Sequence, residues 1–201
     1  DTLKSWQAFH ATDDAASLLS KAFVDAEYEF RAKFLAGQPE PKPRWKQAVS
    51  HAEGIMGEAI GRDYVKLYFP ADAKAKMDAL VANVKVAMGE RLKQLDWMSP
   101  ATRAEAADKL ANFGLKIGHP DQWRDYSALE IRNGDVVGNV LRARAFEWEY
   151  RSARLGGKVD KAEWGMTPQT VNAYYSPVKN EIVFPAAILQ PPFFDPDATD
   201  E

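Results

Sequence analysis

The spacing of apolar residues predicts that most of the chain is helical. Apolar side chains recur at steps of three and four over residues 14–35, 44–69 and 71–95, which places them on one face of a helix. The segment 71–95 shows the clearest pattern. Its apolar stripe consists of Met77, Leu80, Val81, Val84, Met88, Leu92 and Leu95. We therefore expect amphipathic helices packed around a shared core.

Two further helices are indicated by the residues at their ends. Ser99-Pro100 is a strong start signal, because serine accepts hydrogen bonds from the free amides of the first turn and proline fits the first helical position. That helix is expected to run to Phe113, and residues 115–118 after it could form a short strand. A last helix is expected over residues 135–155, closed by two glycines.

Three glycines interrupt the predicted helix 44–69, at Gly54, Gly57 and Gly61. Each glycine costs a helix roughly 1 kcal/mol relative to alanine. We interpret them as sites of close helix–helix contact or of a bend, with a functional loop as the alternative.

The pattern changes to short strands after about residue 165. Residues 171–175 and 181–184 are rich in aromatic and β-branched side chains, and Ser176 to Asn180 suits a hairpin turn. Unpaired strand edges and an apolar stretch at 185–194 predict either disorder after about residue 165 or self-association through residues 165–201.

Composition narrows the possible functions. The net charge of -3 and the pI near 5.7 argue against a nucleic-acid partner, and no apolar run approaches the ~20 residues of a membrane span. The absence of cysteine excludes disulfides, thiolate metal sites and a cysteine nucleophile. The chain begins without an initiator Met, so we expect it to be part of a longer protein.

The sequence contains no complete catalytic or metal motif. Its three histidines, His10, His51 and His119, lie far apart and none has H-E-x-x-H spacing. No G-x-S-x-G elbow occurs. We interpret each histidine as a surface or capping residue.

The segment after residue 170 could instead bind a peptide. A strand with a free edge can hold an extended peptide by main-chain hydrogen bonds. Asn172 would offer a donor and an acceptor to one peptide unit, and Ala173 is too small to obstruct it. Ile188 and Phe193 could line a hydrophobic pocket. The alternative is a core hairpin in which Asn172 bonds to a neighbouring turn.

A family resemblance bears on this choice. The string V-N-A-Y-Y-S-P-V-K-N-E-I-V-F-P-A-A-I-L-Q-P-P-F-F at 171–194 resembles the hallmark of the neprilysin-like zinc endopeptidases. Further family landmarks occur in the family's order, among them 95–98 (L-D-W-M) and 116–120 (K-I-G-H-P). The resemblance extends over essentially the whole chain.

The resemblance implies a mainly α fold in two parts. Residues 1–160 would form a helical bundle, the later part of the family's helical capping domain. Residues 165–201 would begin the thermolysin-like catalytic domain with a β-hairpin that binds substrate. Asn172 and Ala173 match residues that hold the substrate backbone, and Tyr174 matches one lining the pocket before the scissile bond. Ile188 and Phe193 match residues of the hydrophobic pocket after it.

The implied activity is zinc-dependent cleavage of small peptides on the amino side of hydrophobic residues. The family's H-E-x-x-H helix follows Q-P-P-F-F by a few tens of residues, beyond Glu201. We therefore expect no catalytic residue, metal ligand or bound zinc in this chain, and no activity of the chain alone.

The expected partners are peptide substrates and the remainder of the catalytic domain. The expected location is periplasmic or extracellular, with the bacterial cytoplasm as the alternative. A different class of function, a stand-alone non-catalytic helical module that binds peptides, is the alternative to a peptidase fragment.

Overall fold

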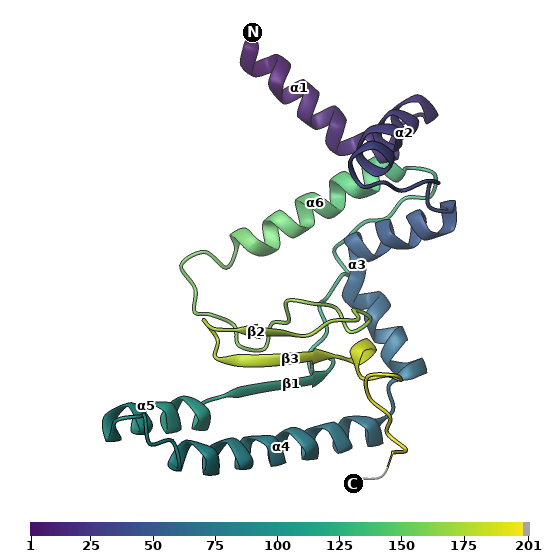
Figure 1. The fold of residues 1–201 in the computed structure, drawn as a ribbon. Coiled ribbons are helices and arrows are strands. Elements are labelled where there is room, and N and C mark those ends of the chain that lie inside the picture. Colours follow the sequence, from purple (N-terminus) through teal and green to yellow (C-terminus); the bar gives the residue numbers. More distant parts are fainter. Residues whose placement is uncertain (199–201) are drawn as a thin grey trace. The chain divides into compact units, whose positions relative to one another are not determined.

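A computed structural model of the chain describes residues 1–198 and is mainly helical, as the sequence predicts (Figure 1). The helices of the described chain are α1 (Thr2–Ala15), α2 (Lys21–Glu27), α3 (Arg44–Tyr68), α4 (Ala71–Lys93), α5 (Pro100–Ala111) and α6 (Val136–Ser152). The strands are β1 (Gly114–Gly118), β2 (Tyr174–Ser176) and β3 (Glu181–Pro185). The segment Tyr28–Leu35 is a π-helix, and Ala16–Leu18 and Ala186–Ile188 are 3₁₀ turns.

The chain forms two compact units. Unit 1 combines residues 1–56 with 125–158, and unit 2 combines residues 57–124 with the chain from 159 onward. The first boundary lies inside α3 at Met56, whose φ of -139° and ψ of 46° are not helical. The helix 44–69 therefore contains a bend, and each unit includes one half of it.

Unit 1 corrects the prediction of one helix over 14–35. The chain leaves the helical conformation at Leu19, which is extended, and a new helix, α2, begins after Ser20. Ser20 occupies the N-cap position, where serine is favoured, and its carbonyl accepts the amides of Phe23 and Val24. The apolar spacing continues across this break, so periodicity alone does not reveal it. The pattern also did not predict α1.

Unit 2 is built around a three-stranded sheet with the order β1-β3-β2. The predicted hairpin is confirmed: β2 is antiparallel to β3, with Tyr174 opposite Val183. Asn180 closes the turn with a φ of +50°, in the left-handed region that asparagine tolerates. The first strand begins only at Tyr174, later than the predicted residue 171. The predicted strand at 115–118 is confirmed and pairs in parallel with β3.

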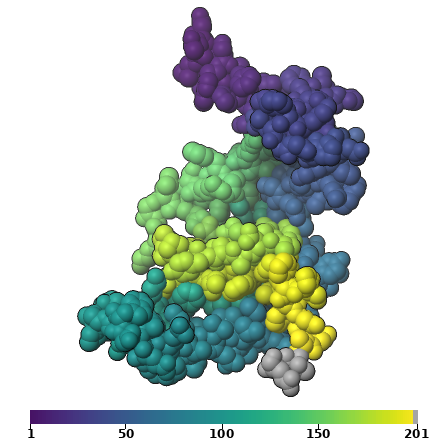
Figure 2. Space-filling view, viewed as in Figure 1, coloured from purple at the N-terminus to yellow at the C-terminus, as the bar shows by residue number. Residues whose placement is uncertain are grey.

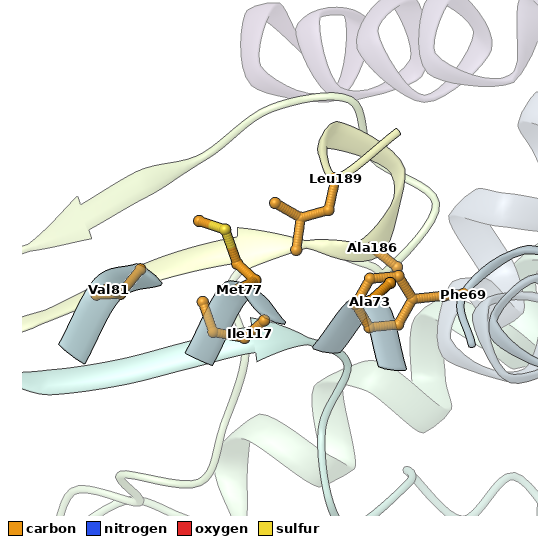
Figure 3. Packing of buried hydrophobic residues seen from close by; sticks show 7 residues of the cluster. All are labelled: Phe69, Ala73, Met77, Val81, Ile117, Ala186 and Leu189. Atoms are coloured by element: carbon orange, nitrogen blue, oxygen red, sulfur yellow. The ribbon is translucent and has the colours of Figure 1, made fainter. Parts of the chain in front are cut away.

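One face of this sheet packs against α4. Figure 3 shows Met77 of α4 beside Ile117 of β1, and the buried cluster is completed by Phe69, Ala73, Val81, Ala186 and Leu189. Pro185 to Ala187 and Leu189 are buried, which corrects the prediction of an exposed apolar face there. The 3₁₀ turn folds these residues onto the core, so self-association through 165–201 loses part of its basis and stays a prediction.

The outer part of the α4 stripe borders an open apolar groove of about 640 Å³ in unit 2. Its lining includes Leu80, Val84, Met88, Leu110, Phe113 and Ile182. Only part of the predicted stripe is therefore buried among the described residues.

Two of the helix glycines allow a loop to approach α3 closely. A Cβ on Gly57 would lie 2.8 Å from Thr167 Cγ2, and one on Gly61 would lie 2.7 Å from Pro168 Cδ. Gln169 Nε2 also donates to the Gly57 carbonyl at 3.0 Å. The predicted close contact is thus present, but it is made with a loop rather than with a second helix.

This contact predicts opposite effects of two glycine-to-alanine changes in unit 2. Gly61→Ala should lower the free energy of unfolding, because the new methyl group must displace the ring of Pro168. Gly89→Ala in α4 should raise it by up to about 1 kcal/mol, the helix propensity gain, since its Cβ would make only an ordinary contact with Leu110 at 3.7 Å. Urea unfolding followed by circular dichroism measures both. Equal stabilisation by the two changes would contradict the close contact.

Candidate functional site

The candidate site is the free edge of β2. In the chain up to residue 198, no strand pairs with the side of β2 that faces away from β3. Along such an edge, alternate residues direct their N–H and C=O groups outward. The strand is only three residues long, so the residues that precede it determine how much of the edge is presented.

Asn172 and Ala173 lie immediately before this strand. Asn172 is exposed, and its Oδ1 accepts the Ala173 amide at 2.8 Å. The backbone amide of Asn172 donates to the Thr170 carbonyl at 3.0 Å. The side chain is therefore engaged locally, by the amide of the next residue, while remaining open to solvent. Binding of a substrate backbone by these two residues stays a prediction.

Tyr174 is turned into the fold. Its ring lies on the same side of the sheet as the fully buried Val183. Its hydroxyl oxygen accepts the Gly165 amide at 2.7 Å. Burial raises the pKa of Tyr174 above its ordinary value, the largest effect, while the hydrogen bond from Gly165 opposes it. Tyr174 thus fixes the loop before the strand, and its predicted role in a substrate pocket stays untested.

The two predicted pocket residues have different surroundings. Ile188 is partly buried and packs against the core of unit 2. Phe193 is 69% exposed, with its amide bonded to Gln190 O. Whether they line one substrate pocket stays a prediction.

A buried polar cluster on the Tyr174 side of the sheet was missed by the sequence reasoning. Lys116 of β1 and Glu181 of β3 form an ion pair with 3.0 Å between Nζ and Oε1. The same ammonium group donates to the Glu163 carbonyl at 2.8 Å. Lys179 Nζ donates to that carbonyl as well, at 3.1 Å. The available signal was one charged residue in each of the two predicted strands, Lys116 in 115–118 and Glu181 in 181–184.

The residues described do not fit a zinc ion. Among residues 1–198, no group of three or more His, Asp or Glu side chains is arranged to hold a metal. His119 hydrogen-bonds the Pro120 carbonyl and stacks on Trp123, and His10 contacts Trp6 and Phe9. No described helix is both long and apolar enough to cross a membrane.

Comparison with known proteins identifies the family. Sequence profiles described as Peptidase family M13 match residues 1–120 and residues 172–201. The chain belongs to peptidase family M13. Neprilysin-3 of Drosophila melanogaster is 36% identical over 96% of this chain, which spans 25% of that protein. The resemblance to neprilysin-like zinc endopeptidases is thereby confirmed.

Solved M13 structures share the fold. The zinc metalloprotease Zmp1 of Mycobacterium tuberculosis, in complex with an inhibitor, is 47% identical with a TM-score of 0.91, covering 98% of this chain and 30% of that one. PepO of Lactobacillus rhamnosis is 35% identical with a TM-score of 0.85, covering 93% of this chain and 30% of that one. The M13 family consists of zinc metallopeptidases, and this chain spans between a quarter and a third of these relatives.

Removing the Tyr174 hydroxyl group should destabilise the fold by a measurable amount. Tyr174→Phe leaves the Gly165 amide without its acceptor and should lower the free energy of unfolding by about 1 kcal/mol. Because burial raises the Tyr174 pKa above its ordinary value, the folded state favours the neutral phenol, and the stability that this preference contributes is lost as the pH rises through the raised pKa. The slope of stability against pH in that range should therefore be shallower in the variant.

Tyr175→Phe is the matched control. Its hydroxyl is exposed and donates to Asn180 Oδ1 at 3.3 Å, so its removal should have a smaller effect. Urea unfolding at pH 7 and at several values above pH 9 compares the two variants. An equal loss of unfolding free energy in the two variants would show that the hydrogen bond from Gly165 to Tyr174 makes no specific contribution.

Proposed function

We propose that this chain supplies the surface that binds the substrate backbone in an M13 zinc endopeptidase. The observation that carries the proposal is the unpaired edge of β2, with Asn172 and Ala173 leading into it. An extended peptide laid along this edge would continue the sheet as a further strand.

The groups at the edge suit a peptide main chain. The exposed Asn172 side chain can exchange its bond to the Ala173 amide for bonds to a substrate, because a carboxamide both donates and accepts. That exchange would also free the Ala173 amide to donate to a substrate carbonyl. The small methyl group of Ala173 allows a backbone to approach.

A preference for cleavage before hydrophobic residues forms part of the proposal. It rests on Ile188 and Phe193, which match pocket residues of the family. Phe193 is exposed and available for contact, while Ile188 would contribute from the margin of the core. The proposed role of this part of the protein is to bind and orient the peptide, because the described residues hold no metal site.

The proposal includes the domain assignment. Residues 1–160 are assigned to the helical capping domain and residues 165–201 to the start of the catalytic domain. The separate M13 matches at 1–120 and 172–201 support such a division.

The first test concerns the 201-residue chain by itself. We expect no stoichiometric zinc by metal analysis and no turnover of a fluorogenic peptide with a hydrophobic residue after the scissile bond. A version extended to the full length of its M13 relatives should cleave the same peptide. Turnover by the short chain that a chelator abolishes would overturn the proposed separation of binding and chemistry.

The second test concerns the edge itself. In the full-length protein, Asn172→Ala should raise KM about tenfold or more for a short peptide, because bonds to the substrate backbone are lost. The matched control is Asn112→Ala, whose side chain bonds Asp108 at the end of α5. An unchanged KM in the Asn172 variant, with the control also unchanged, would rule out Asn172 as a substrate-binding residue.

A further inference from the structure

The edge strand depends on a loop that folds over the sheet. We call residues 160–170 the strap. The strap lies on the sheet face opposite α4, where Pro168 and Val183 are fully buried. Figure 2 shows the yellow-green surface around the hairpin continuing into the yellow surface of the chain after β3. Only Val171 separates the strap from Asn172 and Ala173.

The start of the strap is held by charged groups. The Glu163 carbonyl accepts hydrogen bonds from Lys116 Nζ at 2.8 Å and from Lys179 Nζ at 3.1 Å. Lys179 Nζ also lies 3.5 Å from the Glu163 carboxylate. Glu181 orients Lys116 through the ion pair across β1 and β3. One backbone carbonyl of the strap is therefore held by two ammonium groups.

The rest of the strap is held by neutral contacts. Gly165 donates to the Tyr174 hydroxyl, Pro168 O accepts the Ala187 amide at 2.9 Å, and Gln169 donates to Gly57 O. The charged anchor is the contact farthest from Asn172 along the strap. It joins the strap to β1, a strand that lies at the opposite edge of the sheet from β2.

From these contacts, and resting on the proposed function above, we infer that Lys116 and Glu181 are positioning residues for peptide binding. They fix the strap and, through it, the geometry of Asn172 and Ala173 at the entrance to the edge strand.

The burial of the pair supports a positioning role. The Lys116 and Glu181 side chains are only 13% and 5% exposed. Burying two charges carries a desolvation cost that often offsets their attraction, so apolar residues of similar volume can serve stability equally well. An apolar residue cannot donate to the Glu163 carbonyl, however. The Lys93–Glu90 pair is a useful contrast. The Lys116–Glu181 pair is buried and joins two strands, whereas Lys93 and Glu90 are exposed and belong to one helix.

The test measures KM and kcat separately in the full-length protein. Lys116→Met keeps an unbranched side chain as far as the Cε position and removes the ammonium group. We expect KM for a short peptide to rise about fivefold to twentyfold, with kcat changed less than about twofold, because binding to the edge is shared by ground state and transition state. Glu181→Gln should raise KM in the same direction. Lys116→Arg retains a donor and should recover part of the affinity.

Lys93→Met is the matched control, removing an exposed ammonium group, and should leave KM unchanged. Amide hydrogen exchange in the 201-residue chain gives an independent readout. Exchange at Gly165, Asn172 and Ala173 should become faster in Lys116→Met under conditions where circular dichroism shows a folded chain. Amides of α4 serve as the internal reference.

The outcomes separate the two proposals. A KM within twofold of the starting protein, together with a lower melting temperature, would make Lys116 merely structural and overturn the inference. If Lys116→Met does not fold, Glu181→Gln and Lys116→Arg provide the test instead. An unchanged KM in both of these variants would equally overturn the inference. If the unmodified full-length protein neither cleaves nor binds peptides, the proposed function itself fails.

Discussion

The parallel pairing of β1 with β3 is the constraint on which unit 2 depends. It joins residues 114–118 to residues 181–185, across more than sixty intervening positions. The pairing places β3 at the centre of the sheet, with Val183 fully buried. Both α4 on one face and the strap on the other pack against a surface that exists only when these two distant segments meet.

The two faces of the sheet have different chemistry because side chains alternate along each strand. Leu115, Ile117 and Phe184 face α4 and form an apolar core. Lys116 and Glu181 point to the other side, where they meet the strap. The pairing of β1 with β3 therefore forms the apolar core on one face and the Lys116–Glu181 anchor on the other. Because β2 pairs with β3, it is connected to both faces through that strand.

The sequence predicted the elements better than their partners. Helices α3 to α6 and the hairpin were predictable because apolar spacing, the Ser99 cap and the turn residues are local signals. The parallel partner of β1 was not, since nothing in residues 114–118 specifies a strand so far along the chain. The break at Leu19 was hidden because the apolar spacing of 14–35 continues through it.

For the candidate site, too, the residues were predictable but their surroundings were not. Asn172, Ala173, Tyr174, Ile188 and Phe193 could be named from the family resemblance, but their surroundings could not. The inward position of Tyr174 depends on Gly165, and the packing of Ile188 depends on α4. Lys116 and Glu181 were not predicted, because a charged residue on a half-buried strand is usually solvent-facing. Only the strap makes that side an interior.

A three-residue edge strand has few hydrogen bonds of its own to resist distortion, and a short two-stranded hairpin is marginally stable. Yet an edge that binds a peptide backbone must hold its outward groups in register, since a displacement of one residue would reverse their directions. The rigidity must therefore come from outside the strand. In this fold it comes from the strap, which β1, β2 and α3 hold at separate points. The proposed peptide binding and the core of unit 2 would thus depend on the same strand pairing.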